Sequence, residues 1–227
     1  MANNPIVNMF RVKEIRGRIF FTLIVLAVFR LGSVLTIPGI NPEALTTYFR
    51  SATGASNSFV DYMDFFAGGA FSNFTVFMLG VMPYISTQII LQLALIIFPS
   101  LKRIAQEDGG QKKIQSWTRI GTVFVCLIQS LAVTVYASSI PGAVVISSDI
   151  LFKVIAMISV TTGTMVTIWL GEQITARGIG NGISMLIFAG IVARLPSAVW
   201  ELGRMVSEDM SKLVSVIVVL IMFVGIV

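Results

Sequence analysis

The chain has 227 residues, of which 56% are hydrophobic and only 12% are charged. Soluble domains carry about 25% Asp, Glu, Lys and Arg, so this composition excludes an ordinary soluble fold and indicates a membrane protein. The formal charge of +5 does not point to nucleic acid, because the basic residues fall in short segments between apolar runs, where membrane topology accounts for them.

The sequence also excludes most enzymatic chemistry. It has no histidine and a single cysteine, Cys126, so neither a Ser-His nor a Cys-His nucleophile can be assembled, and metal sites built from Cys and His are excluded. The aspartates that an intramembrane protease would need lie outside the long apolar runs or at their ends: Asp61, Asp64, Asp108, Asp149 and Asp209. We therefore predict no enzymatic activity, no metal and no cofactor, and expect Cys126 to face lipid or neighbouring helices.

The chain is predicted to begin with a cytoplasmic segment over residues 1–18 and a first membrane span over 19–37. A polar loop follows over 41–64, and then a weakly charged region over 65–98 that is longer than the roughly 20 residues of one span. Because Gly68 and Gly69 interrupt this region early, we expect a short half-helix over about 60–71, followed by a full span over 74–98. Pro83 should kink that span by removing a backbone donor.

Three further spans are predicted over residues 120–137, 154–171 and 179–193, after a charged loop at 102–113. The fifth span should leave the membrane through Pro196. The run from residue 213 to 227 is apolar throughout but is too short to cross comfortably. We therefore expect an N-terminal segment (1–18), a bundle of five spans (19–200), and an external loop with the start of a sixth span (201–227).

The distribution of basic residues predicts the orientation. Alternating the five spans places residues 1–18, 99–119 and Arg177 on one side, with ten Lys or Arg, and leaves five on the opposite side. Cytoplasmic segments carry the excess of Lys and Arg, so the N-terminus is predicted to be cytoplasmic. Arg30 remains inside the first span, where it is costly. It lies near the outer end and can extend to the membrane surface, which favours a structural role.

The broken second segment is the first candidate for function. Backbone groups of a half-helix must be satisfied by protein or water, because lipid cannot do so. Gly-interrupted segments of this kind line transport pathways in membrane transporters. The residues alone leave two interpretations open, a movable apolar wedge beside a pathway and an interfacial helix with a structural role.

A stripe on the next helix is the second candidate. Val81, Ile85, Gln88 and Gln92 follow one helical face, with the apolar pair toward the outside of the polar pair. Such a stripe could line a water-filled funnel that ends in a hydrophobic constriction. Isoleucines at 183 and 187 repeat the four-residue spacing. The alternative is ordinary packing between membrane helices, in which Gln side chains bond to neighbouring helices, and the spacing alone favours it.

Six motifs occur in order along almost the whole chain. They are FRLG at 29–32, IPGI at 37–40, FAGGA at 66–70, LGVMPYIS at 79–86, WLGEQIT at 169–175 and RGIGNGIS at 177–184. Together they resemble the N-terminal half of the SecY family of bacterial protein-conducting channels. The resemblance implies an all-α polytopic bundle of ten spans in two inverted halves, of which this chain would supply five and the start of the sixth.

The resemblance also implies roles for particular residues. Val81, Ile85, Ile183 and Ile187 would belong to the pore ring, with Val81 at a position where the family usually has isoleucine. The lateral gate between the second and third helices would include Ser86 and Gln129. The plug that seals the closed pore would comprise eight residues: Asp64, Phe65, Phe66, Ala67, Gly68, Gly69, Ala70 and Phe71.

The implied function is to pass unfolded secretory proteins across the membrane and membrane proteins sideways into the bilayer. The implied partners are the SecE and SecG subunits, the SecA ATPase, the ribosome, signal sequences, nascent polypeptides and membrane lipids, with no nucleic-acid site in this half. The implied location is the bacterial inner membrane. Two other classes stay open: half of a small-solute secondary transporter, which would need charged or strongly polar groups at the midplane, and a structural or assembly subunit.

Overall fold

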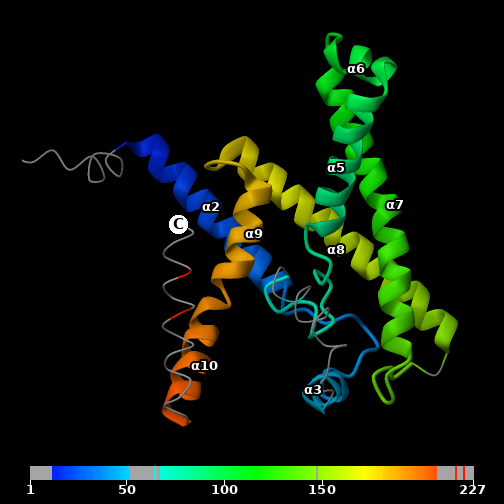
Figure 1. Cartoon of the computed structure of the whole chain (residues 1–227), viewed down its shortest axis with the longest axis vertical. Helices are drawn as coiled ribbons and strands as arrows, with labels where there is room; N and C mark the ends of the chain where they lie inside the picture. Colours follow the sequence, from blue (N-terminus) through cyan, green and yellow to red (C-terminus); the bar gives the residue numbers. More distant parts are fainter. Residues whose placement is uncertain are drawn as a thin grey trace, which may run out of the picture.

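The computed structural model describes residues 12–51, 64, 67–146, 148–208, 218 and 222. Within these ranges the protein consists of α-helices joined by turns, with two isolated β-bridges, so the all-α prediction is confirmed. Helix α7 packs most extensively against α8 and also against α5, while α8 contacts α9 and α2 (Figure 1). The helices are α2 (Lys13–Gly32), α3 (Pro42–Ser51), α5 (Met82–Ile97), α6 (Pro99–Gln106), α7 (Gly110–Ser138), α8 (Asp149–Arg177), α9 (Gly182–Val192) and α10 (Leu195–Glu208).

Three stretches in the described part of the chain are long and apolar enough to cross a membrane: α7, α8 and Gly182–Trp200. Helices α5 and α6 would add a fourth if they counted as one span, but they are bent by 105° at their junction. The predicted first span corresponds to α2, which fails the same criterion because every 18-residue window within it contains Arg16, Arg18 and Arg30. Five spans were predicted, whereas the length and composition of the described helices identify three, or four if the bent pair counts as one.

The second predicted span differs from the structure at both ends. Helix α5 begins at Met82, so Pro83 lies in its first turn and does not kink it. Proline suits this position because its missing N–H would have no helical partner and its φ is already helical. At the other end, Phe98 is extended (φ −103°, ψ 105°) and Pro99 starts α6 in a new direction. The residue before a proline avoids the helical region, which explains the sharp bend.

The expected half-helix over about 60–71 is wrong over residues 67–71, whereas Asp64 is helical. Residues 67–81 form a series of turns, and Gly68 and Gly69 both have positive φ values, 64° and 95°. Glycine adopts this region without steric cost, so the two glycines reverse the chain where a helix was expected. Residues 60–63, 65 and 66 of this segment lie outside the described residues.

The interface of α7 is built on small polar side chains. Five of them recur at every fourth position, all buried: Thr118, Thr122, Cys126, Ser130 and Thr134. The Thr122 hydroxyl donates to the Thr118 carbonyl at 2.6 Å, and the other three hydroxyls also bond to carbonyls of their own helix. Small side chains let apolar helices approach closely. Cys126 is fully buried and meets Thr161 and Thr164 of α8, so it faces the bundle.

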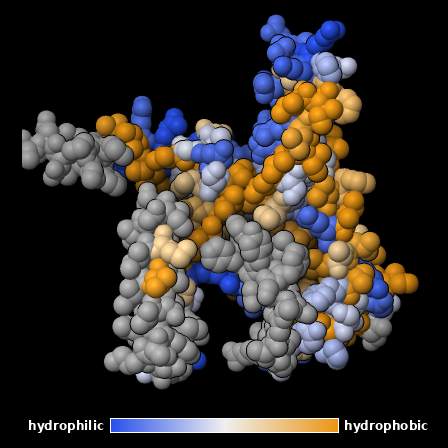
Figure 2. Space-filling view, in the orientation of Figure 1, coloured by the Kyte–Doolittle hydropathy of each residue, from blue (hydrophilic) through white to orange (hydrophobic). Residues whose placement is uncertain are grey.

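The ends of the helices fall into two groups in Figure 1. The start of α2, the tip at α6 and the junction of α8 with α9 lie toward the top, whereas α3, the connection from α7 to α8, and α10 lie toward the bottom. The tip at α6 is strongly hydrophilic, and apolar side chains cover α5 and α7 below it (Figure 2). This grouping matches the predicted alternation of spans. Helix α10 continues to Glu208, so the first part of the expected external loop is helical.

Candidate functional site

A cavity of about 500 Å³ lies where the turns of residues 67–81 meet α5, α7 and α9. Its wall includes three of the four side chains expected in the pore ring, Val81, Ile85 and Ile187. The remaining lining residues are all uncharged: Ala67, Phe71, Met78, Leu79, Gly80, Met82, Ser86, Gln129, Ala132 and Val133. The structure thus brings together the predicted plug, ring and lateral-gate residues in one uncharged cavity.

Local backbone geometry aims these side chains into the cavity. Val81 is the N-cap of α5, and Ile85 follows four residues later on the same face. Gly80 has a positive φ of 53°, which turns the chain sharply into the helix. On α7, Gln129 and Val133 repeat the four-residue spacing and reach the cavity from the other side.

Ile183 is placed differently from the other three predicted ring residues. It does not line the cavity but packs in the same apolar cluster as Val81, Ile85 and Ile187. Its Cδ1 lies 2.8 Å from where a Cβ at Gly171 of α8 would be, so the missing side chain at Gly171 makes room for it. In this structure Ile183 therefore supports the cavity wall from behind.

The polar end of the α5 stripe faces a second hollow. Gln88 and Gln92 line a space of about 410 Å³ between α5 and the first turns of α7, together with Tyr84 and Thr118. Val81 and Ile85 line the first cavity. The four side chains of the predicted stripe therefore face two hollows that follow one another along α5, apolar first and polar second.

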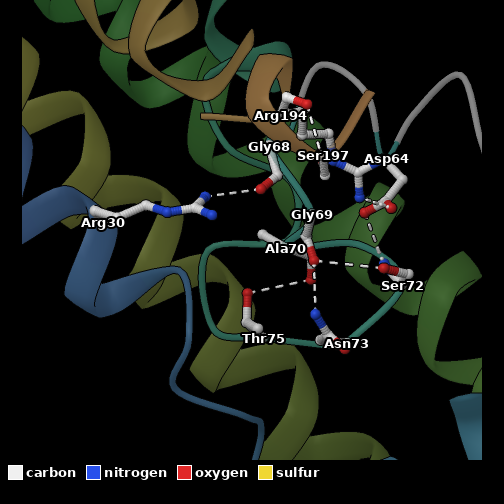
Figure 3. A network of polar contacts seen from close by, with 10 residues as sticks. All are labelled: Arg30, Asp64, Gly68, Gly69, Ala70, Ser72, Asn73, Thr75, Arg194 and Ser197. Atoms are coloured by element: carbon white, nitrogen blue, oxygen red, sulfur yellow. Dashed lines mark hydrogen bonds and ion pairs between the residues drawn. The ribbon is translucent and has the colours of Figure 1, made fainter. Parts of the chain in front are cut away.

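Polar contacts fix the glycine turn beside the cavity (Figure 3). The Arg30 Nη1 atom of α2 donates to the Gly68 carbonyl at 2.8 Å, so this arginine, which is costly inside a span, has a protein acceptor at the turn. From the opposite side, the Arg194 guanidinium pairs with the Asp64 carboxylate. Arg194 was not among the predicted site residues, although an arginine immediately after a span and an aspartate four residues before a glycine pair are charges that need partners near a membrane.

Close backbone packing seats the same turn on α9. A Cβ at Gly68 would lie 2.9 Å from both the Cα and the carbonyl oxygen of Gly190, so only glycine allows this approach. Ala67 and Phe71, on either side of the turn, reach the cavity, while Phe65 and Phe66 of the predicted plug lie outside the described residues.

An uncharged cavity inside a bundle of apolar helices, beside a glycine-interrupted segment, defines the class as a polytopic membrane channel or transporter. A family model described as SecY matches residues 75–227. The chain belongs to the SecY family. It is 45% identical over 214 residues to the protein translocase subunit SecY of Borreliella burgdorferi, covering 94% of this chain and 49% of that protein.

Other comparisons agree. The SecY subunit of Escherichia coli is 40% identical over 214 residues, covering 92% of this chain and 48% of that protein. Two solved structures, one of a protein-conducting channel and one of Sec61 in the canine ribosome-channel complex, match 99% of this chain and 52% of theirs, with TM-scores of 0.60 and 0.61. At 18% identity this similarity shows the fold alone. The chain spans about half the length of these relatives.

Proposed function

We propose that this chain supplies the N-terminal half of a protein-conducting channel. The whole protein would pass unfolded secretory proteins across the membrane and release membrane proteins sideways into the bilayer. The observation that carries the proposal is the uncharged cavity in which Val81, Ile85 and Ile187 meet the glycine turn. Flexible aliphatic side chains make no directional bonds, so a waist built from them accepts polypeptides of any sequence.

Each part of the cavity takes a role in this proposal. The ring would consist of Val81, Ile85, Ile183 and Ile187, and its apolar surface would exclude water and hinder ions when the channel is idle. The segment from Asp64 to Phe71 would be the plug, and its position on α9 beside the cavity supports this role. Ser86 on α5 and Gln129 on α7 line the cavity between the two helices, which supports the lateral-gate assignment.

The remaining proposals concern the setting of the channel. The N-terminus would lie in the cytoplasm of a bacterium, with the protein in its inner membrane, as the grouping of basic segments supports. The partners would be SecE, SecG, SecA, the ribosome, signal sequences and nascent chains, since the relatives are translocase subunits and one similar structure is a ribosome-channel complex. The driving energy would come from those partners, and the chain itself would carry out no covalent chemistry.

Photo-crosslinking of a stalled secretory chain in the full-length protein tests the proposal. A photoreactive residue at position 81, 85 or 187 should crosslink to the stalled chain, because these side chains line the cavity. A probe at position 183 should crosslink as well if Ile183 turns into the waist when the channel opens. Ile158 on α8 is 62% exposed and lies outside the cavity, so the same probe at 158 is the control and should not crosslink.

Two outcomes would replace the proposal. Tight binding of a small solute that protects these positions, without polypeptide crosslinks, would favour the transporter. Equal labelling of position 158 and of the four ring positions by lipid alone would leave only a structural membrane subunit.

A further inference from the structure

Asp64 is a buried carboxylate with both oxygens engaged. The residue is only 5% exposed. Its Oδ1 accepts from the backbone N–H of Ser72 at 2.9 Å, and its Oδ2 pairs with Nη2 of Arg194 (Figure 3). The first contact closes the turn on itself, while the second joins the turn to the end of α9. The two oxygens of one side chain thus have separable structural roles.

Arg194 holds the turn at more than one point. Its Nη2 lies 3.2 Å from where a Cβ at Gly69 would be, so the guanidinium lies directly against the turn. Arg194 itself falls between α9 and α10, immediately after the helix on which Gly68 is seated. Arg30 of α2 holds the other side of the turn through the Gly68 carbonyl. The turn is therefore fixed between Arg30 of α2 and Arg194 of the α9–α10 junction, and among the described residues only Arg194 of the two pairs with a carboxylate.

We propose that the Asp64–Arg194 ion pair keeps the glycine turn seated beside the cavity and separates when the channel opens, which makes both side chains positioning residues of the plug. This inference rests on the proposed function. A partly buried pair is screened by salt less than a surface pair, so it stabilises the seated turn. Once the turn moves away, water can solvate both charges, which keeps the separation reversible.

A double-mutant cycle in the full-length protein, assembled with its partner subunits in planar bilayers, tests the pair through idle ion conductance. Asp64→Asn keeps an oxygen for the Ser72 N–H but removes the charge, and Arg194→Gln removes the opposite charge. We expect each single variant to raise idle conductance about tenfold, equivalent to about 1.4 kcal/mol. The double variant should show no more than either single variant, because the same interaction is lost in all three.

The chain offers two matched controls. Arg194→Lys keeps the charge and should leave conductance within about twofold of the unaltered protein, because the contact with Asp64 is made through Nη2 and not through a bidentate fork, so a lysine ammonium can replace it. Asp149 and Lys153 form an ion pair within α8, away from the turn. Asp149→Asn with Lys153→Gln should leave conductance unchanged, because an exposed pair contributes little.

Deletion of residues 64–71 separates a failure of this inference from a failure of the proposed function. If the deletion raises conductance but the single variants do not, or if the double variant multiplies the two effects to about a hundredfold, the ion-pair inference alone is overturned. If the deletion leaves conductance unchanged, the assignment of residues 64–71 as the plug in the proposed function is wrong. The ion-pair inference then fails as well, because it depends on that assignment.

Discussion

Two faces of helix α7 differ in how closely they are packed. On one face, small polar side chains every four residues, from Thr122 to Thr134, are buried in the bundle, with Cys126 against α8. On the other, Gln129, Ala132 and Val133 border a cavity of about 500 Å³. Both faces belong to one apolar helix, yet one is closed and the other open.

The difference lies in how each face satisfies its polar groups and its volume. The Thr and Ser hydroxyls of the closed face donate to carbonyls of their own helix, so they can be buried without a partner across the interface. The open face, with Gln129, Ala132 and Val133, lies across the cavity from the turns of residues 67–81, α5 and α9, and these side chains do not fill the space between them. A close-packed interface fixes the relative position of two helices, whereas a face that borders a cavity leaves room for another molecule.

The closed face is the most sensitive to added volume. Thr122→Leu should destabilise the full-length protein by about 1–3 kcal/mol, because Thr122 is fully buried and an extra methyl group forces the interface apart. The midpoint of thermal unfolding in detergent measures the effect. Phe124→Leu, at a side chain that is 66% exposed on the same helix, is the control and should change the midpoint little. Equal effects at the two positions would contradict the comparison.

The open face should respond in conductance. Ile85→Ser and Ile187→Ser should each raise idle conductance about fivefold, because a polar side chain lowers the barrier to wetting the waist by about 1 kcal/mol. Single-channel recording in bilayers measures this. Leu131→Ser on α7, which lies outside the cavity wall, is the matched control. No increase at either isoleucine, or an equal increase at Leu131, would count against the ring.

The smallest effect should come from the charged end of the α7–α8 pair. Arg119 donates from Nε and Nη2 to the two oxygens of Glu172 at 2.8 and 2.7 Å. The arginine side chain is 47% exposed, so Arg119→Gln should cost about 1 kcal/mol or less. Thermal unfolding at low and high salt measures it, and the difference should shrink as salt rises. A loss as large as that of Thr122→Leu would show that this charge pair contributes as much to the packing of α7 as its buried face does.

Much of the site could be predicted from the sequence, because its signals are local. The four-residue spacing of Val81 and Ile85 places them on one face of any helix, and the motif resemblance supplied Ile187, Ser86 and Gln129, which the structure places around the same cavity. The start of α5 could not be predicted correctly. The apolar run from residue 74 continues without a break, and hydrophobicity does not show that Phe74 and Gly80 adopt positive φ.

Composition determined by itself that this is a helical membrane protein, since an uncharged apolar run must satisfy its own backbone hydrogen bonds in lipid. Only the tertiary structure decided which residues are partners across the chain. Asp64 and Arg194 are 130 residues apart, and Gly68 meets Gly190. Such contacts depend on how helices are placed relative to one another, and helix placement follows from side-chain volume and backbone approach between distant segments, which leave no periodic pattern in the sequence.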